Sequence, residues 1–366
     1  MHIYLWGQRT LLGAGIHYAN FSDAMKRLTL VGDMVREVDV CSSNLKSIAE
    51  GTEKDDIHIL FASLAEPVSL QGSVIKWGVF ESNILSTEYV HYLKKSHAVW
   101  VPSSWARDVL INHGLSKTQV DVVPEGVDPM VFNPLLRESV VKDHYFRFFM
   151  CGKYEKRKGY DELLKGFYRA FSKDVNVKLY LKPDNFSLDK ACGDSKGSEL
   201  RRAVAAQGLQ DSVVFIEGRY SAHDLALLNS YCDAQIFPSR AEGWGLPLIE
   251  GLATGLPTIS NYYSGHTEYL GAVKQHIACL DYETQLVEDL KDIGRGADGA
   301  VWAVANPDSI AANMVAVRDN PRSWRSKALK ASEVIRAEFS WENSVVKAVL
   351  SLKRRSILNL KIDLAL

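Results

Sequence analysis

The residues best suited to do chemistry lie in one loop, where two glutamates stand eight positions apart. Glu242 precedes the glycines Gly243 and Gly245, and Glu250 follows Pro247 in the predicted first turn of a helix. Glycines let backbone amides approach a ligand closely, and amides at a helix start attract an anion. The flanking carboxylates can accept hydrogen bonds from sugar hydroxyls. The segment therefore predicts an anion- and hydroxyl-binding site. The alternative is that Glu250 only complements the helix dipole and Glu242 is a solvent-exposed loop residue.

A basic loop is the second candidate. It runs from Cys151 to Tyr160, directly after a predicted strand, with Lys153 and Lys158 flanking it. Two cations at a strand end can balance the charge of an anionic ligand, and a charge that balances one developing in a transition state contributes a few kcal/mol. The alternative interpretation is a solvated basic turn.

Alternating short apolar runs and amphipathic stretches must position these loops, and they indicate an α/β fold. A turn-rich crossing predicts an N-terminal domain over residues 1–135 and a C-terminal domain over residues 136–344. Ser104 is the expected N-cap of one helix. Ligand-binding loops lie at the carboxyl ends of parallel strands, and two such domains are expected to face each other across a cleft. Strands are expected at residues 3–6, 57–61, 76–80, 98–101, 120–123, 146–150, 177–181, 213–216, 234–237 and 257–260.

Length and composition bound the class of protein. The chain has 366 residues, enough for two domains, with a net charge of −1, 46% hydrophobic and 24% charged residues. The charge balance argues against a protein that coats nucleic acid, and the hydrophobic fraction excludes disorder. The five scattered cysteines form no C-x-x-C pair, which excludes zinc ribbons and disulfide scaffolds. There is no signal peptide and no apolar run of about 18 residues, so a soluble cytoplasmic protein is expected.

The loop from Phe237 to Glu250 resembles the E-x7-E signature of family 4 retaining glycosyltransferases, which have the GT-B fold of two Rossmann-like domains. The resemblance implies that Glu250 holds the ribose of a nucleotide and that Glu242 contacts the donor sugar. The loop between them would meet the diphosphate or the sugar, largely through backbone amides. Its residues are Gly243, Trp244, Gly245 and Leu246.

The basic loop strengthens the resemblance. The family pattern G-R-x-x-x-x-K-G occurs here as G-K-x-x-x-x-K-G, with Lys153 in place of the usual arginine. Lysine keeps the charge but loses the forked geometry of a guanidinium, so the phosphate contact is expected to differ in detail. The resemblance makes Lys153 and Lys158 catalytic residues that stabilise the departing diphosphate.

Two weaker sets of positions follow from the resemblance. Gly13 and Gly15 would lie opposite the donor diphosphate, although a plain strand–helix turn explains this pair equally well. Gly218, Arg219 and Tyr220 would clasp the nucleotide base, mostly through backbone.

One departure concerns the N-terminal domain, where many family members carry a histidine near the reacting sugar. None can be assigned here. Glu81 stands at the comparable strand end and is given an acceptor-side role, either hydrogen bonding or taking the acceptor proton. A plain strand-end carboxylate is the alternative. The closing phrase Phe339–Glu342 also resembles the family, and the tail over residues 345–366 is expected to pack back on the N-terminal domain.

Residues and resemblance together predict a metal-independent retaining glycosyltransferase with no cofactor beyond its substrate. The chain contains no D-x-D motif to hold a metal. The donor is expected to be a UDP- or GDP-sugar. The acceptor hydroxyl is expected to belong to a glycan or lipid-linked glycan of cell-surface polysaccharide synthesis. The basic and apolar tail over residues 352–361 predicts either a packed helix or peripheral contact with anionic lipid at the inner face of a membrane.

Other functions remain open at this point. A nucleotide-sugar epimerase of the same fold would act without an acceptor, and an inactive module would bind the donor without turnover. Transfer to a protein or nucleic acid is a minor option, since the charge balance disfavours nucleic-acid partners. The sequence does not name the sugar, the base, the acceptor or the oligomeric state.

Overall fold

The computed structural model describes residues 1–11, 13–61, 68–183 and 195–358, and it divides the chain into two compact units. Unit 1 comprises Met1–Phe80, Leu85–Gly126 and Phe339–Leu366, and unit 2 comprises Glu81–Ile84 and Val127–Glu338. The chain thus changes unit after Gly126, whereas the sequence placed the boundary at residue 135. The crossing belongs to unit 2 because Arg137 donates to the carbonyl of Cys232 at 2.7 Å and to Asp233 at 3.0 Å.

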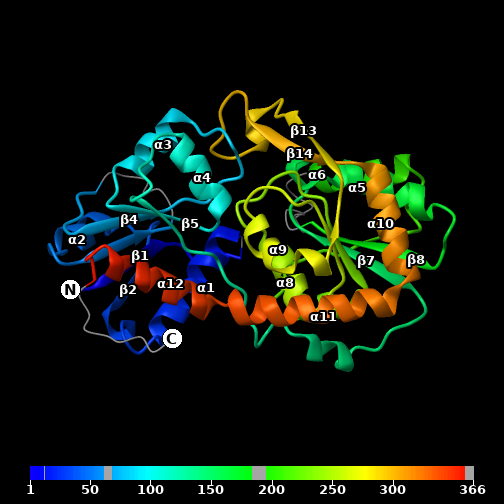
Figure 1. Ribbon diagram of the computed structural model, residues 1–366, viewed down its shortest axis with the longest axis horizontal. Helices are drawn as coiled ribbons and strands as arrows, with labels where there is room; N and C mark the ends of the chain where they lie inside the picture. The colour runs from blue at the N-terminus through cyan, green and yellow to red at the C-terminus, as the bar shows by residue number, and fades with distance from the viewer. Residues whose placement is uncertain (12, 62–67, 184–194, 359–366) are drawn as a thin grey trace. The chain divides into compact units, whose positions relative to one another are not determined.

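Unit 1 is built on a parallel six-stranded sheet of order β2-β1-β3-β4-β5-β6. Its elements are β1 (Ile3–Gly7), α1 (Gly13–Arg27), η1 (Gly32–Met34), β2 (Val35–Asp39), α2 (Leu45–Glu50), β3 (Ile57–Leu60), β4 (Ser73–Trp77), α3 (Thr87–Lys94), β5 (Ala98–Val101), α4 (Ser104–Asn112), β6 (Val120–Val122) and α12 (Trp341–Arg354). Strands β3 and β5 are buried at every position, as their continuous apolar runs require. Helix α12 lies beside α1 and returns the end of the chain to this unit (Figure 1).

One predicted helix cap of unit 1 is wrong by one residue. The N-cap of α4 is Ser103, whose hydroxyl accepts a hydrogen bond from the amide of Ala106. Ser103 has the extended backbone that a cap needs, and Ser104 is already the first helical residue.

Unit 2 is built on a second parallel six-stranded sheet, of order β12-β11-β10-β7-β8-β9. Its elements are η2 (Pro134–Ser139), β7 (Phe146–Cys151), η3 (Lys156–Lys158), α5 (Tyr160–Phe171), β8 (Val177–Lys182), α6 (Ser195–Ala206), β9 (Val213–Phe215), α7 (Ala222–Tyr231), β10 (Ala234–Phe237), α8 (Leu246–Ala253), β11 (Thr258–Ser260), α9 (Thr267–Val273), η5 (Lys274–His276), β12 (Ala278–Cys279), β13 (Tyr282–Leu286), η6 (Leu290–Asp292), β14 (Val301–Ala305), α10 (Pro307–Asp319) and α11 (Pro321–Glu338). Helices α5 and α10 lie side by side (Figure 1). Gly166 permits this approach, because a Cβ there would lie 2.4 Å from Cγ2 of Ile310.

Unit 2 also carries an antiparallel hairpin, β13–β14, that the sequence did not predict. Every residue of β13 is exposed, whereas Trp302 and Ala303 of β14 are buried. The amide of Ala303 donates to the carbonyl of Arg240 at 2.9 Å, and the amide of Val301 donates to Asn83 at 2.8 Å. The hairpin thereby joins the loop after β10 to the segment Glu81–Ile84.

The two parallel sheets confirm the predicted α/β fold. In each sheet the strand order reverses once, between β1 and β3 in unit 1 and between β7 and β10 in unit 2. Open α/β sheets bind ligands outside the carboxyl ends of their strands at such topological switch points. These two places are called here the unit 1 switch point and the unit 2 switch point.

Candidate functional site

The two strongest motifs of the sequence meet at the unit 2 switch point. The loop after β7 carries Lys153 and Lys158, and the loop after β10 carries Glu242 and Gly245. Neighbouring parallel strands bring their carboxyl-terminal loops to the same edge of the sheet. Lys158 and Glu242 are therefore in direct contact although they lie 84 residues apart.

Glu242 is the centre of this site and is only 4% exposed. Its Oε1 accepts hydrogen bonds from Lys158 Nζ at 2.6 Å and from Ser239 Oγ at 2.5 Å, and its Oε2 lies 3.1 Å from Arg157 Nη1. Burial alone would raise the pKa of Glu242, but the charges of Lys158 and Arg157 outweigh burial and lower the pKa to about 2. Glu242 is therefore a fixed, ionised hydrogen-bond acceptor at neutral pH.

Arg157 is a residue of this site that sequence reasoning missed. Its Nη1 donates to the carbonyl of Ala241 at 2.7 Å, and its Nη2 lies 3.5 Å from Glu81 Oε1 and 3.4 Å from Glu155 Oε2. Burial lowers the pKa of the guanidinium, but the neighbouring carboxylates more than compensate and raise the pKa. In the sequence, the signal for Arg157 was its position in the middle of three consecutive basic residues, 156–158. The family pattern directed attention to Lys153 instead.

Glu81 reaches the same site as part of unit 2. The segment Glu81–Ile84 is held by the loop between β13 and β14, where the amide of Ala297 donates to the carbonyl of Ile84 at 3.0 Å. The carboxylate of Glu81 thus lies beside the guanidinium of Arg157. Its acceptor-side role remains a prediction.

A loop after β11 braces the backbone of Glu242. Ser264 Oγ accepts a hydrogen bond from the Glu242 amide at 2.8 Å, and the amide of Gly265 donates to the Glu242 carbonyl at 2.9 Å. A Cβ on Gly265 would lie 2.0 Å from the carbonyl oxygen of Gly243, so the two loops approach closely only because residue 265 is glycine. Sequence reasoning assigned no role to Ser264 or Gly265, since a contact with backbone has no local pattern.

Helix α8 begins directly after the Glu242 loop. Its N-cap is Gly245, with φ of +93°, a residue that has no side chain to cap the helix. The helix starts at Leu246, one residue before the predicted Pro247. The hydroxyl of Tyr269 donates to the carbonyls of Trp244 and Gly245, both at 3.1 Å, which fixes the turn. A helix start carries partial positive charge that suits an anion.

Two predicted residues lie outside the hydrogen bonds of Glu242. Lys153 is 42% exposed, and its ion pair is with Glu155, at 3.9 Å. Glu250 is half-buried on α8. The Glu242 carboxylate is therefore paired with Lys158 and Arg157. It is not paired with Lys153, the other lysine of the sequence motif.

The residues expected to clasp a base lie after β9, at the carboxyl edge of the same sheet. Gly218 has a φ of +100°, which favours glycine, and Arg219 is exposed. The ring of Tyr220 lies 5.2 Å from the ammonium of Lys182, the last residue of β8. Their contact with a base remains a prediction.

Gly13 and Gly15 belong to unit 1, in the first turn of α1. A Cβ on Gly15 would lie 2.1 Å from Oγ1 of Thr10, so this glycine lets the loop pack tightly, whereas no atom of the described residues lies within 4 Å of a Cβ on Gly13. This packing explains Gly15 as a turn residue, and the role of Gly13 remains a prediction.

The unit 1 switch point is aromatic. His17 on α1 is buried, stacks on Trp341 with 5.7 Å between ring centroids, and meets Trp77 edge-on at 4.4 Å. Its Nδ1 lies 3.6 Å from Glu125 Oε1, and burial lowers the pKa of His17 to about 3. Within the described ranges, His17 Nε2 and Trp77 Nε1 have no hydrogen-bond partner. The sequence analysis assigned His17 no role.

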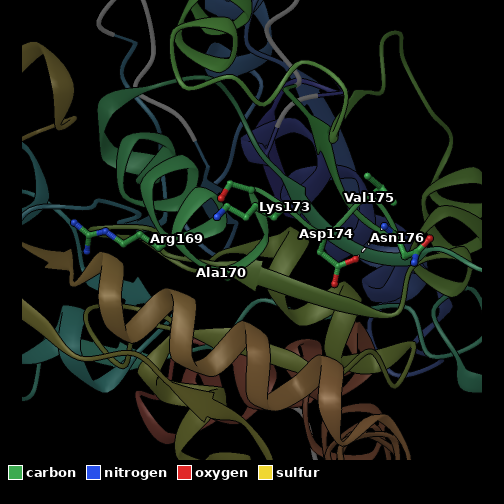
Figure 2. Close-up of a pocket in the computed structure, with 7 residues that line it drawn as sticks. Arg169, Ala170, Lys173, Asp174, Val175 and Asn176 are labelled. Atoms are coloured by element: carbon green, nitrogen blue, oxygen red, sulfur yellow. Dashed lines mark hydrogen bonds between the residues drawn. The ribbon is translucent and has the colours of Figure 1, made fainter.

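A pocket of about 600 Å³ lies away from these residues, in the turn between α5 and β8 (Figure 2). The turn precedes β8, so it is at the amino ends of the strands, opposite the Glu242 edge. Its Asp174 forms an ion pair with Arg318 at 2.8 Å, which is a contact of the fold.

Among the described residues, no three or more His, Cys, Asp or Glu side chains are grouped so that they could hold a metal ion. No helix in the described part of the chain has the length and apolar character needed to span a membrane.

Fold and site together define a doubly wound α/β protein with a charged ligand-binding edge on its second sheet. Residues 133–295 match the model of the family described as glycosyl transferases group 1. Both the E-x7-E motif and the basic loop lie inside the matched segment. The resemblance to glycosyltransferases is therefore confirmed.

Similarity to a curated relative covers less than half of the chain. Mannosylfructose-phosphate synthase of Agrobacterium fabrum is 28% identical over 165 residues, which is 43% of this chain and 36% of that protein. The chain spans 36–39% of the length of the first relatives it matches.

Solved structures share the fold over nearly the whole chain. A glycosyltransferase from Rickettsia africae has a TM-score of 0.72 at 14% identity, over 97% of this chain and 98% of that one. HepE from Anabaena, solved in complex with UDP and glucose, has a TM-score of 0.67 at 14% identity, over 97% of this chain and 100% of that one. With the two strand orders, this likeness confirms the predicted GT-B fold.

Proposed function

We propose that this protein transfers a sugar from a nucleoside diphosphate sugar to a hydroxyl group of an acceptor. The observation that carries the proposal is the buried carboxylate of Glu242, held ionised by Lys158 and Arg157 at a switch point and followed by the start of α8 at Gly245. A fixed carboxylate suits a sugar hydroxyl, and helix-start amides suit a diphosphate. The match of residues 133–295 to a glycosyltransferase family model supports this function.

In this proposal the diphosphate lies against the amides of Gly245 and Leu246. Lys158 balances the charge that develops on the diphosphate as the sugar departs. Glu242 accepts a hydrogen bond from the donor sugar, and Glu250 holds the ribose. Gly243 and Trp244 complete the loop around the sugar, and Gly218, Arg219 and Tyr220 enclose the base.

We assign the remaining predicted residues to the acceptor side. Gly13 and Gly15 lie opposite the diphosphate, and Glu81 contacts the acceptor hydroxyl. The acceptor attacks from the face that the diphosphate leaves, so the anomeric configuration is retained and a donor phosphate oxygen takes the proton. Lys153, Lys158 and the start of α8 replace a metal ion in stabilising the leaving group.

The donor is proposed to be a UDP- or GDP-sugar, and the acceptor a glycan or a lipid-linked glycan. The UDP complex of HepE supports testing uridine donors first. The name of mannosylfructose-phosphate synthase supports adding sugar phosphates to the acceptor panel. A lipid-linked acceptor would place the reaction at the inner face of a membrane.

A thermal-shift screen of UDP-, GDP-, dTDP- and ADP-sugars tests the donor, followed by transfer assays with the donor that binds. Glu250→Ala is expected to weaken donor binding, and Lys158→Ala is expected mainly to slow transfer. Lys156→Ala is the matched control, because Lys156 is more exposed and pairs with Glu288 at 2.8 Å instead of with Glu242. Wild-type kinetics in both test variants would remove the assigned site.

The same assays separate the other two functions. An epimerase would convert the donor sugar with no acceptor present. An inactive binding module would show a thermal shift with a donor and no turnover across the acceptor panel. Transfer with inversion at the anomeric carbon would keep the glycosyltransferase and overturn the retaining mechanism.

A further inference from the structure

Ser264 has a backbone conformation that serines rarely adopt. Its φ is +62°, in the left-handed region that favours glycine. In the described ranges two other non-glycine residues, Arg295 and Ser356, share a positive φ, and both are exposed. Ser264 is 1% exposed, so neither water nor an open loop accounts for its backbone. A non-glycine residue kept in this region indicates that its side chain has a task.

The side chain of Ser264 holds the backbone of Glu242. Its Oγ accepts the hydrogen bond of the Glu242 amide at 2.8 Å, in a buried environment. The next residue, Gly265, donates from its amide to the Glu242 carbonyl at 2.9 Å. The peptide groups on both sides of the Glu242 Cα are thus fixed by two successive residues of one loop.

The left-handed backbone makes this double contact. The chain turns sharply enough at Ser264 that Oγ of residue 264 and N of residue 265 both reach residue 242, while Gly265 packs on Gly243. Without the hydroxyl, the Glu242 amide would be buried with no acceptor, and a buried unpaired amide drives the backbone to move.

We propose that Ser264 is a positioning residue that sets the backbone of Glu242, and through it the direction of the carboxylate, for sugar transfer. Three groups fix the carboxylate itself: Lys158, Arg157 and Ser239. Ser264 fixes the Cα from which the side chain extends. This inference rests on the proposed function, because it assumes that the carboxylate of Glu242 acts on the donor sugar.

Two substitutions separate this role from simple stabilisation. Ser264→Ala removes the acceptor and keeps a Cβ in the left-handed region, whereas Ser264→Gly removes the acceptor and relieves the backbone. We expect kcat to fall about tenfold or more in both variants, with the donor KM changing less than threefold, because misplacement of a group by about 1 Å costs up to 10²-fold in rate. The melting temperature should fall more in Ser264→Ala than in Ser264→Gly, because glycine relieves the backbone while both variants lose the buried hydrogen bond.

The matched control is Ser356, an exposed serine of unit 1 with φ of +56°. Ser356→Gly and Ser356→Ala repeat the same chemistry without a Glu242 contact, and both should keep the wild-type kcat. A wild-type kcat in Ser264→Gly would overturn the proposal, since relief of the backbone would then restore the function without the hydroxyl.

Hydrogen exchange of the Glu242 amide keeps the proposal testable if no donor is turned over. The amide should exchange at least tenfold faster in both Ser264 variants than in the wild type and the Ser356 variants. Unchanged exchange would overturn the positioning role. If the Glu242 amide exchanged faster in the Ser264 variants but the wild-type protein transferred no sugar, the contact between Ser264 and Glu242 would be supported. The proposed function would then be overturned instead.

Discussion

The two switch points occupy the same place in their sheets and are built from opposite kinds of side chain. In unit 2 the carboxylate of Glu242 is buried with two cations and stays ionised at a pKa of about 2. In unit 1 the imidazole of His17 is buried among aromatic rings and is kept neutral, with a pKa of about 3. Both groups have lowered pKa values, but the first shift preserves a charge and the second abolishes one.

The contrast shows that topology provides a place and side chains decide its chemistry. A site with fixed charges beside a helix start suits a diphosphate, whereas a site lined mainly by aromatic rings suits a ligand that offers hydroxyls and apolar faces. This fits the proposed donor site in unit 2. Four changes to single residues test the contrast.

Removing a cation from the unit 2 switch point is expected to have the largest effect. In Lys158→Met, Glu242 stays buried while losing its shorter ion pair, and breaking a buried pair costs about 3–5 kcal/mol of the free energy of unfolding. We also expect kcat for transfer to fall about 10²–10³-fold. Denaturant unfolding and steady-state assays measure the two effects. An unfolding free energy within about 1 kcal/mol of the wild type would mean that Glu242 is not a buried ion.

Acid should affect the two switch points in a fixed order. An unfolded histidine titrates near pH 6.5, so the unfolded chain takes up the His17 proton first, and stability falls as the pH drops from about 6.5 toward 3. The contribution of Glu242 is complete above pH 4.5 and is lost as the pH falls through about 2. Unfolding free energies measured from pH 7 to pH 4 should therefore decline mainly through histidine.

His17→Phe tests this order, because phenylalanine keeps an aromatic ring and removes the titration. Between pH 6.5 and pH 4.5 the variant should lose about 2 kcal/mol less stability than the wild type. Part of the decline should remain, because burial lowers the pKa of His266 in unit 2 to about 4. An unchanged decline in His17→Phe would show that His17 is not held neutral in the folded protein.

A smaller effect is expected from loosening the helix that completes the unit 1 switch point. Helix α12, which supplies Trp341, is fastened by Asp121 on β6. Asp121 accepts hydrogen bonds from Arg355 Nε and Ser351 Oγ, both at 2.6 Å. Asp121→Asn removes the charge and should cost about 1–2 kcal/mol of unfolding free energy. Calorimetric titration should show unchanged donor binding; a weakened donor affinity would contradict the separation of the two sites.

The smallest effect is expected at Lys153. Its pair with Glu155 is partly exposed, and such pairs contribute less than about 1 kcal/mol, so Lys153→Ala should leave the unfolding free energy nearly unchanged. Its kcat should fall less than that of Lys158→Met, and Lys153→Arg should retain full activity by offering the fork of the family pattern. If kcat fell as much in Lys153→Ala as in Lys158→Met, the centre of phosphate binding would have to be moved toward Lys153.

Most of the fold could be predicted from the sequence because central strands of parallel sheets are buried on both faces. Strands such as β5 and β10 are short, mostly apolar and buried runs, and the sequence places them correctly. Strand β2 lies at a sheet edge and has only two apolar residues among five, and β13 is exposed throughout, so neither has a strong signal. Burial thus decides which strands a sequence reveals.

The site residues also fall into two groups: those that a local sequence pattern reveals and those that only a contact in the folded chain reveals. Lys158 and Glu242 were found because each belongs to a local motif. Arg157 and Ser264 were not, because their parts depend on which loop lies beside them after folding. The predicted pairing of Lys153 with Lys158 came from proximity in sequence, whereas the structure pairs Lys158 with a carboxylate from another strand end.

The short segment Glu81–Ile84 has a practical consequence for the design of hybrids of this protein. Unit 2 is not one stretch of gene, since four of its residues are encoded inside the unit 1 region and the last helix of unit 1 follows the unit 2 region. In a hybrid with a single crossover after Gly126, residues 81–84 would come from the other parent protein. The partners of Arg157 and Val301, which are Glu81 and Asn83, would then be foreign to the rest of unit 2. Exchanging complete units takes four junctions, at 80/81, 84/85, 126/127 and 338/339.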